Sequence, residues 1–180
     1  MTVEIVFETH ALTEDNENGF ATGWLPGRLS ERGRANAANM GRRRRHDGIA
    51  AVFSSDLRRS VETAQIAFGN SQIPILYDWR LRECDFGAHN GSPSVDVGRD
   101  RLTYCDVPYP GGGESHSQAI ARVARALPDL YTRWSGRRIM LIGHLATYRA
   151  LEQAAHGGTV HELVAATFEW RPHGWEYRLP

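Results

Sequence analysis

Hydrophobic runs and amphipathic segments alternate along the chain. Four short runs of aliphatic and β-branched residues have the length and composition of buried strands. The predicted strands span Val3–Phe7, Ala50–Ser54, Pro74–Tyr77 and Arg138–Ile142. The segments between them favour helices, for example where Leu57, Val61, Ala64 and Phe68 share one helical face. The predicted helices span residues 30–41, with Ser30 as N-cap, then 55–68, 114–134 and 147–155.

Three other segments lack this pattern. Residues 8–28 are polar and glycine-rich, which is typical of a loop. Residues 79–113 are rich in Gly, Pro and Asp, and an irregular stretch of that length is usually a lid or a binding loop. Residues 163–178 have the pattern of two strands joined at Arg171–Gly174, so the sequence predicts a C-terminal β-hairpin.

Strands that alternate with helices predict an α/β fold with a mostly parallel central sheet. The apolar runs indicate strands that are buried on both faces. A length of 180 residues suits one domain spanning residues 1–180. Ligands of such sheets bind outside the carboxyl ends of the strands, so the residues that follow each strand are the candidates for chemistry.

Composition excludes several classes of protein. With 41% hydrophobic and 23% charged residues, the chain differs from disordered and disulfide-stapled proteins. The 21 basic residues balance 21 acidic ones, which gives no sign of a nucleic-acid or membrane partner. No apolar run is long enough to span a bilayer, and no basic stretch precedes the first strand as in a signal peptide. We therefore expect a cytoplasmic protein.

Every basic residue is arginine, which is explained either by codon usage, the interpretation we favour, or by selection for groups that clamp anions. The run Arg42–Arg45 is predicted to be a solvated helix end, where cations suit the helix dipole. Cys84 and Cys105 fit neither a zinc pattern nor CxxC, so we expect two free thiols.

Chemistry-bearing residues follow three of the predicted strands. His10 follows the first strand, His144 follows the fourth, and Arg59 lies just beyond the second. Glu83 joins them if its loop folds over this edge of the sheet. A neutral imidazole can attack phosphorus, a second imidazole and a guanidinium can stabilise the phosphoryl oxygens, and a carboxyl group can exchange protons with the leaving and attacking oxygens. Taken singly, each of these residues is more often structural; it is their coincidence that points to phosphoryl transfer, and spacing alone does not decide it.

Several ordered motifs resemble those of the histidine phosphatase superfamily, in its phosphoglycerate-mutase-like branch. The motifs are Thr9-His10-Ala11-Leu12-Thr13-Glu14-Asp15-Asn16, Leu29-Ser30-Glu31-Arg32-Gly33, Ser54-Ser55-Asp56-Leu57-Arg58-Arg59, Leu81-Arg82-Glu83-Cys84-Asp85-Phe86-Gly87, Pro110-Gly111-Gly112-Gly113-Glu114-Ser115 and Gly143-His144-Leu145-Ala146-Thr147-Tyr148-Arg149. The resemblance covers nearly the whole chain in the family's order and implies a three-layer α/β sandwich.

The resemblance also implies roles. His10 is expected to be the phosphorylated nucleophile, Glu83 the general acid, and His144 a catalytic partner that binds the phosphoryl oxygens. Arg59 is expected to bind the same oxygens. The positions expected near the phosphate are Thr9, Thr13 and Asn16. The expected substrate is a small phosphorylated metabolite, with no metal or other cofactor; the oligomeric state stays open.

The sequence departs from the family's pattern at the centre of this site. Thr9 stands where the family has a phosphate-binding arginine, Ala11 where it has glycine, and Leu145-Ala146 where it has Gly-Gly. Loss of one guanidinium removes charge-assisted hydrogen bonds of roughly 1.5–3 kcal/mol each. The sequence offers Arg28, Arg82 and Arg149 as replacements.

Two interpretations follow. In the first, the chain is a phosphomonoesterase that works through a phosphohistidine. In the second, it is a divergent member whose phosphoryl transfer is lost or altered, either a binding protein or an enzyme of different chemistry. The joint presence of His10, Arg59, Glu83 and His144 favours the first. A mutase is the less favoured activity, because the chain is short.

Overall fold

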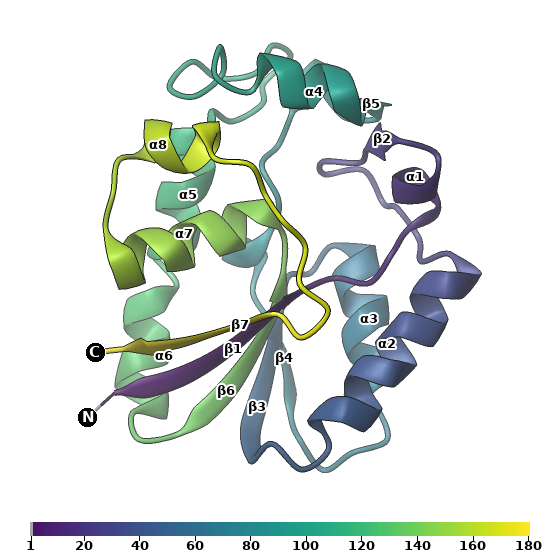
Figure 1. Cartoon of the computed structure of the whole chain (residues 1–180), viewed down its shortest axis with the longest axis vertical. Coiled ribbons are helices and arrows are strands. Elements are labelled where there is room, and N and C mark those ends of the chain that lie inside the picture. The colour runs from purple at the N-terminus through teal and green to yellow at the C-terminus, as the bar shows by residue number, and fades with distance from the viewer. Residues whose placement is uncertain (1) are drawn as a thin grey trace.

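The computed structural model describes residues 2–180 and has a twisted five-stranded sheet at its centre (Figure 1). The spatial order of the strands is β4-β3-β6-β1-β7. Their bounds are β1 Val3–Thr9, β3 Ile49–Ser54, β4 Ile75–Tyr77, β6 Arg138–Gly143 and β7 Trp175–Leu179. β4, β3, β6 and β1 run parallel, and β7 pairs with β1 in the antiparallel sense. The mostly parallel sheet predicted from the sequence is confirmed.

Helices cover both faces of this sheet (Figure 1). Their bounds are α1 Glu14–Glu17, α2 Glu31–Arg44, α3 Arg58–Phe68, α4 Ser94–Asp100, α5 His116–Ala124, α6 Leu127–Trp134, α7 Leu145–His156 and α8 Val160–Ala165. α2 and α3 lie on one face, and α5, α6 and α7 on the other. The three-layer α/β sandwich is therefore confirmed.

The burial of the strands follows from this double covering. Every residue from Ile139 to Ile142 in β6 is fully buried, because helices pack on both faces. In β1, Val3, Ile5 and Phe7 face the layer of α5, α6 and α7, whereas Val6 faces α2 and α3. Because β1 and β6 run parallel, their carboxyl ends lie at the same edge of the sheet.

α2 begins as predicted and sits close against the chain that leaves β1. Ser30 caps the helix by accepting a hydrogen bond from the Gly33 N–H at 3.1 Å. A Cβ atom at Gly33 would lie 1.8 Å from the Leu12 carbonyl oxygen, so only glycine permits this approach. The segment that carries His10 is thus held directly beside α2.

The predicted C-terminal hairpin is wrong. Residues 160–165 form α8 instead of a strand, with Thr159 and Glu162 closing a capping box at its N-terminus. The only strand in this region is β7, whose partner is β1 at the edge of the central sheet. For β7, pairing with the free edge of the central sheet at β1 is more favourable than pairing within a local hairpin.

Two other expectations need correction. The single helix predicted over 114–134 is two helices, α5 and α6, and Pro128 lies in the first turn of α6, a position that proline favours. The stretch 79–113 is not irregular throughout. It contains the 3₁₀ turns η1 Trp79–Leu81 and η2 Gly87–His89, the helix α4, and the strand β5 Ser92–Pro93, which pairs with β2 Phe20–Ala21.

The arginine run is only partly solvated. Arg44 is buried at the end of α2, and its Nε donates to Glu8 Oε1 at 2.8 Å, while Arg43 Nη2 donates to Glu8 Oε2 at 2.6 Å. Asp47 Oδ2 accepts a further hydrogen bond from Arg44 at 2.7 Å. The prediction of a solvated helix end is therefore wrong for these two residues, because a buried carboxylate on β1 pairs with both.

Candidate active site

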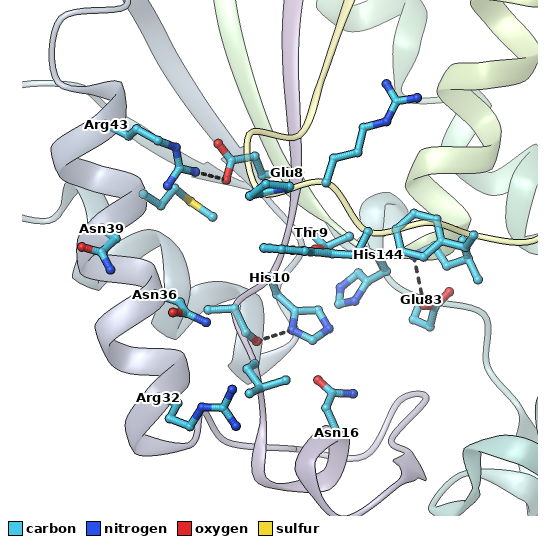
Figure 2. Close-up of a pocket in the computed structure, with 18 residues that line it drawn as sticks. Glu8, Thr9, His10, Asn16, Arg32, Asn36, Asn39, Arg43, Glu83 and His144 are labelled. Carbon is cyan, nitrogen blue, oxygen red and sulfur yellow. Dashed lines mark hydrogen bonds and ion pairs between the residues drawn. The ribbon is translucent and has the colours of Figure 1, made fainter.

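The two strand-end histidines meet at the carboxyl edge of the sheet. In the parallel register of β1 and β6, Thr9 lies opposite Gly143, so the next residue of each strand is a histidine. The ring centroids of His10 and His144 are 5.0 Å apart, with an angle of 51° between the ring planes. Figure 2 shows both rings at the floor of one cavity. The convergence predicted from the strand ends is confirmed.

Hydrogen bonding fixes the tautomer of His10. Its Nδ1 lies 2.8 Å from the Ala11 carbonyl oxygen, which can only accept, so the proton is on Nδ1 and Nε2 carries the lone pair. The Ala11 N–H in turn donates to Thr63 Oγ1 at 3.0 Å, which holds this backbone in place. Burial, reinforced by the charge of Arg59, lowers the pKa of His10 to about 3, so the ring is neutral at physiological pH.

His144 is buried beside two hydroxyl groups. Its Nε2 lies 2.7 Å from Ser55 Oγ and 3.3 Å from Ser60 Oγ, and its Nδ1 lies 3.4 Å from Arg59 Nη2. Because a guanidinium only donates, Nδ1 is the acceptor and Nε2 carries the proton. Burial, with smaller contributions from Arg59 and His10, lowers the pKa of His144 well below 6.5.

Arg59 lies behind the two rings and is 2% exposed. Its Nε donates to His10 Nε2 at 3.2 Å, and its Nη2 donates to the Gly23 carbonyl oxygen at 2.8 Å. Burial lowers the pKa of Arg59 to about 10, which leaves the guanidinium charged at neutral pH. The Arg59 guanidinium therefore hydrogen-bonds to both imidazoles and holds the loop after β2 against the site.

The Glu83 carboxylate caps the N-terminus of α7. Its Oε2 accepts from the Leu145 N–H at 3.1 Å, and its Oε1 accepts from the N–H groups of Ala146 at 3.1 Å and Cys84 at 2.9 Å. Three N–H donors and the positive end of the helix dipole hold this negative charge next to His144. The loop that carries Glu83 therefore folds over the carboxyl ends of the strands, which is the condition for Glu83 to join the two histidines.

The backbone of Glu83 is held by residues that sequence reasoning did not single out. Its carbonyl oxygen accepts hydrogen bonds from Trp24 Nε1 at 2.7 Å and from Arg122 Nη2 at 2.9 Å. Arg122 is buried and forms an ion pair with Glu114 at 2.7 Å. The carboxylate thus stands on a rigid support, a condition for accurate proton transfer.

A cavity of about 630 Å³ opens in front of these groups. Its lining residues are Glu8, Thr9, His10, Ala11, Leu12, Asn16, Arg32, Asn36, Asn39, Met40, Arg43, Glu83, His144, Leu145, Phe168, Trp170, Arg171 and Pro172. Thr9 and Asn16 thus lie at the site, as expected. Thr13 does not line it: this residue is fully buried, and its hydroxyl caps α1 by accepting from the Asn16 N–H at 3.0 Å.

None of the arginines proposed to replace the missing guanidinium lines the cavity. Arg28 pairs with Glu14 at 2.6 Å, and Arg82 pairs with Asp56 at 2.6 Å. Arg149 is buried, and its Nη1 lies 3.3 Å from His116 Nδ1. The cationic side chains at the cavity wall are instead Arg32, Arg43 and Arg171.

One face of α2 lines the cavity, and the spacing of its polar residues in the sequence is a pattern from which this could have been predicted. Arg32, Asn36, Asn39 and Arg43 recur at the spacing of one helical face, and that face is polar although it looks toward the site (Figure 2). The part of the cavity wall that lies within residues 168–172 could not be predicted from the sequence, because the sequence predicts a β-hairpin in this segment.

Within residues 2–180, no cluster of three His, Cys, Asp or Glu side chains could hold a metal ion. The same residues include no helix with the length and apolarity needed to cross a membrane. Cys84 and Cys105 are both buried free thiols.

A parallel α/β sandwich with two histidines at the carboxyl edge of its sheet is the architecture of phosphoglycerate-mutase-like proteins. The chain belongs to the histidine phosphatase superfamily: the family described as "Histidine phosphatase superfamily (branch 1)" matches residues 5–175.

Named relatives of the chain include phosphoglycerate mutases and a mutase-like protein. A 2,3-bisphosphoglycerate-dependent phosphoglycerate mutase of Methylobacterium sp. (strain 4-46) is 32% identical over 97% of this chain and 90% of its own. Phosphoglycerate mutase-like protein 4 of Arabidopsis thaliana is 32% identical over 84% of this chain and 70% of its own.

Solved structures share the fold. Bacillus stearothermophilus YhfR superposes with a TM-score of 0.83 at 25% identity, over 94% of this chain and 88% of its own. A native mycobacterial glucosyl-3-phosphoglycerate phosphatase gives a TM-score of 0.74 at 26% identity, over 91% and 83% of the two chains. The superfamily and these neighbours consist of phosphatases and mutases, which supports an enzyme of the phosphoryl-transfer type.

Proposed function

We propose that the protein is a phosphomonoesterase that acts on a small phosphorylated metabolite through a phosphohistidine intermediate. The observation that carries the proposal is the state of His10. Its Nδ1–H is fixed by the Ala11 carbonyl, which leaves the Nε2 lone pair on a neutral ring at the floor of an accessible cavity. Arg59 donates to this lone pair in the free protein, and once Arg59 turns to the phosphoryl oxygens the neutral imidazole is the nucleophile that phosphoryl transfer requires.

In the first half-reaction, His10 Nε2 attacks phosphorus, and the bond between phosphorus and the leaving oxygen breaks. The anion takes over the N–H groups that Arg59 directs at His10 Nε2 and His144 Nδ1 in the free protein. With Nδ1 released, the His144 proton moves to Nδ1 and is donated to the same oxygens, while Ser55 Oγ donates to Nε2. Glu83 gives its proton to the leaving oxygen. That proton enters with the substrate, which binds as its phosphate monoanion and passes the proton to the Glu83 carboxylate.

In the second half-reaction, the Glu83 carboxylate takes a proton from a water molecule, whose oxygen attacks the phosphorus. The bond between phosphorus and Nε2 breaks, Glu83 passes the proton to the departing inorganic phosphate, and neutral His10 and the Glu83 carboxylate are restored. Each group therefore ends in the state in which it began, and no further reactant is needed.

Hydrolysis is proposed over mutase activity because Thr9 places no second guanidinium beside His10 and His144, where Arg59 already lies. A mutase must retain and reorient a bisphosphorylated intermediate, which places a larger demand on the positive charge of the site. A panel of phosphomonoesters, assayed for released phosphate and for isomerised product, distinguishes the two activities.

Thr9→Arg is expected to raise kcat/KM for phosphomonoesters about ten- to a hundredfold, because a new guanidinium contributes charge-assisted hydrogen bonds of roughly 1.5–3 kcal/mol. Thr9 lines the cavity beside His10, so the longer side chain has access to the anion. Thr9→Gln is the control, since it has similar reach without the charge. An equal rise in both variants would contradict the electrostatic reason, and activity that appears only in Thr9→Arg would favour a native site whose phosphoryl transfer has been lost.

The pH dependence of His10 gives another test. Because burial and Arg59 lower the pKa of His10 to about 3, the ring stays neutral throughout pH 5–8 and is protonated only near the lower value. We therefore expect no loss of activity from His10 protonation within that range. NMR titration of the imidazole signals, assigned with His10→Gln, measures this directly. A His10 signal that titrates near 6.5 would contradict the proposed environment.

A further inference from the structure

The cavity continues far beyond the two imidazoles. Arg32 and Arg43 both line it and are eleven positions apart in α2, which corresponds to about 16 Å along the helix axis. A volume of about 630 Å³ is within the range that encloses ligands much larger than an inorganic phosphate. The arrangement therefore provides a compartment for the leaving group of the substrate.

We name this compartment the α2 groove. Its helical wall consists of Arg32, Asn36, Asn39 and Arg43, and its opposite wall includes Phe168 and Trp170. Figure 2 shows the four labelled residues of α2 in a row on the side that leads to His10. Among residues 2–180, the Asn36 side chain has no hydrogen-bond partner.

The Trp170 side chain is exposed and, among the described residues, has no packing partner that explains its position. The residue is 64% exposed, and within the described chain its ring contacts neither another aromatic ring nor a cation. The neighbouring Phe168, by contrast, packs against Tyr148 and Trp175 with ring centroids 5.2 and 5.5 Å away. A large aromatic surface that lines a cavity and lacks a partner is suited to a ligand.

The wall that carries Trp170 is anchored at both ends. Before it, Arg101 donates to the carbonyl oxygens of Val164 at 2.8 Å and Ala165 at 2.9 Å. After it, Arg44 donates to the carbonyl oxygen of His173 at 2.6 Å, which ties this wall to the end of α2. The groove is thus formed before any ligand binds, which reduces the entropy cost of binding.

Acidic residues pair with both arginines of the helical wall, whereas Arg171 has no acidic partner among residues 2–180 and lies over the Trp175 ring at 5.6 Å. Glu8 pairs with Arg43, and Glu17 lies 3.4 Å from Arg32. The helical wall therefore presents amide and guanidinium hydrogen-bond donors with little uncompensated charge, which suits hydroxyl groups better than a second anion. One wall is aromatic and the other is polar. A sugar ring has this same asymmetry, with a C–H face that stacks on indole and a rim of hydroxyl groups.

We infer that the α2 groove is the subsite for the sugar ring of a hexose phosphate. The ring stacks on Trp170, and its hydroxyl groups donate to and accept from the Asn36 amide and accept from the flanking arginines. The inference rests on the proposed function, because it places the phosphate of that substrate at His10. A nucleobase is a poorer match, since the wall opposite Trp170 offers no second aromatic ring for a sandwich.

Calorimetry with the non-hydrolysing His10→Gln variant tests the groove apart from turnover. The ligands are glucose 1-phosphate, glucose 6-phosphate, mannose 6-phosphate, AMP and inorganic phosphate. We expect at least one hexose phosphate to bind more tightly than inorganic phosphate and AMP. Adding Trp170→Ala is expected to weaken that binding about tenfold, with inorganic phosphate unchanged. Adding Asn36→Ala is expected to weaken it in the same way. Trp79→Ala is the matched control, because Trp79 is 51% exposed and does not line the cavity.

Tighter binding of AMP than of every hexose phosphate would overturn the assignment, as would hexose phosphate binding that is insensitive to Trp170→Ala. Turnover of acetyl phosphate by the native protein keeps the two proposals apart. If acetyl phosphate is hydrolysed but no hexose phosphate depends on Trp170, the groove assignment fails and the phosphatase stands. If hexose phosphates bind through Trp170 but nothing is hydrolysed, the phosphatase fails and the groove stands.

Discussion

His10→Gln is expected to reduce phosphomonoester hydrolysis by at least about 10³-fold, because it removes the atom that forms the covalent intermediate. Arg59 keeps its hydrogen bond to His144, and Glu83 keeps those from the N–H groups of Leu145 and Ala146, so binding without turnover is retained. Steady-state release of phosphate from p-nitrophenyl phosphate measures the loss. Acid-labile, base-stable label retained on the native protein after a quench with ³²P-labelled substrate identifies the phosphohistidine.

His46→Gln is the control for this variant, since His46 is exposed near the end of α2 and does not line the cavity. It is expected to keep native activity and to retain label. Hydrolysis by His10→Gln at close to the native rate would show that another nucleophile acts, or that water attacks the substrate directly. Label on His10→Gln would show that another residue acts as the nucleophile.

Glu83→Gln is expected to separate the two half-reactions. An amide cannot protonate an alkoxide, so kcat for alkyl phosphates should fall by roughly 10²–10⁴-fold. With p-nitrophenyl phosphate the leaving group needs no proton, and phosphorylation of His10 proceeds. The second half-reaction still lacks its base, so nitrophenol should appear as a burst of about one equivalent, followed by a slow phase.

Stopped-flow absorbance measures this burst, and Glu31→Gln, an exposed substitution in the first turn of α2, is the control without a burst. An equal decrease in kcat for alkyl phosphates and p-nitrophenyl phosphate, with no burst, would contradict the acid–base role of Glu83. The result would then indicate that its carboxylate only positions the N-terminus of α7 through Leu145 and Ala146.

The convergence of the two histidines could be predicted because it depends on a regular property of parallel sheets. β1 and β6 are recognisable as apolar runs, and parallel neighbours end at the same edge. The capping of α2 by Ser30 could also be predicted, since a cap depends on residues only a few positions apart.

The partners of the arginines could not be predicted in this way. Arg44 and Glu8 are thirty-six positions apart, and nothing local distinguishes an arginine that pairs with a buried carboxylate from one that stays in water. For the same reason Arg28, Arg82 and Arg149 could be named as replacements for the missing guanidinium although each is engaged elsewhere.

The amino-acid sequence by itself determined the family, the layered α/β fold and the edge of the sheet at which His10, Arg59, Glu83 and His144 gather. These follow from hydrophobic periodicity and from motifs whose parts lie close together in the chain. Only the tertiary structure decided that Thr13 is buried away from the cavity, that the C-terminal segment pairs with β1, and that α2 and Trp170 form the two walls of a groove. Those features depend on contacts between segments far apart in sequence, whose free energies are set by packing and by charge pairing that no local pattern encodes.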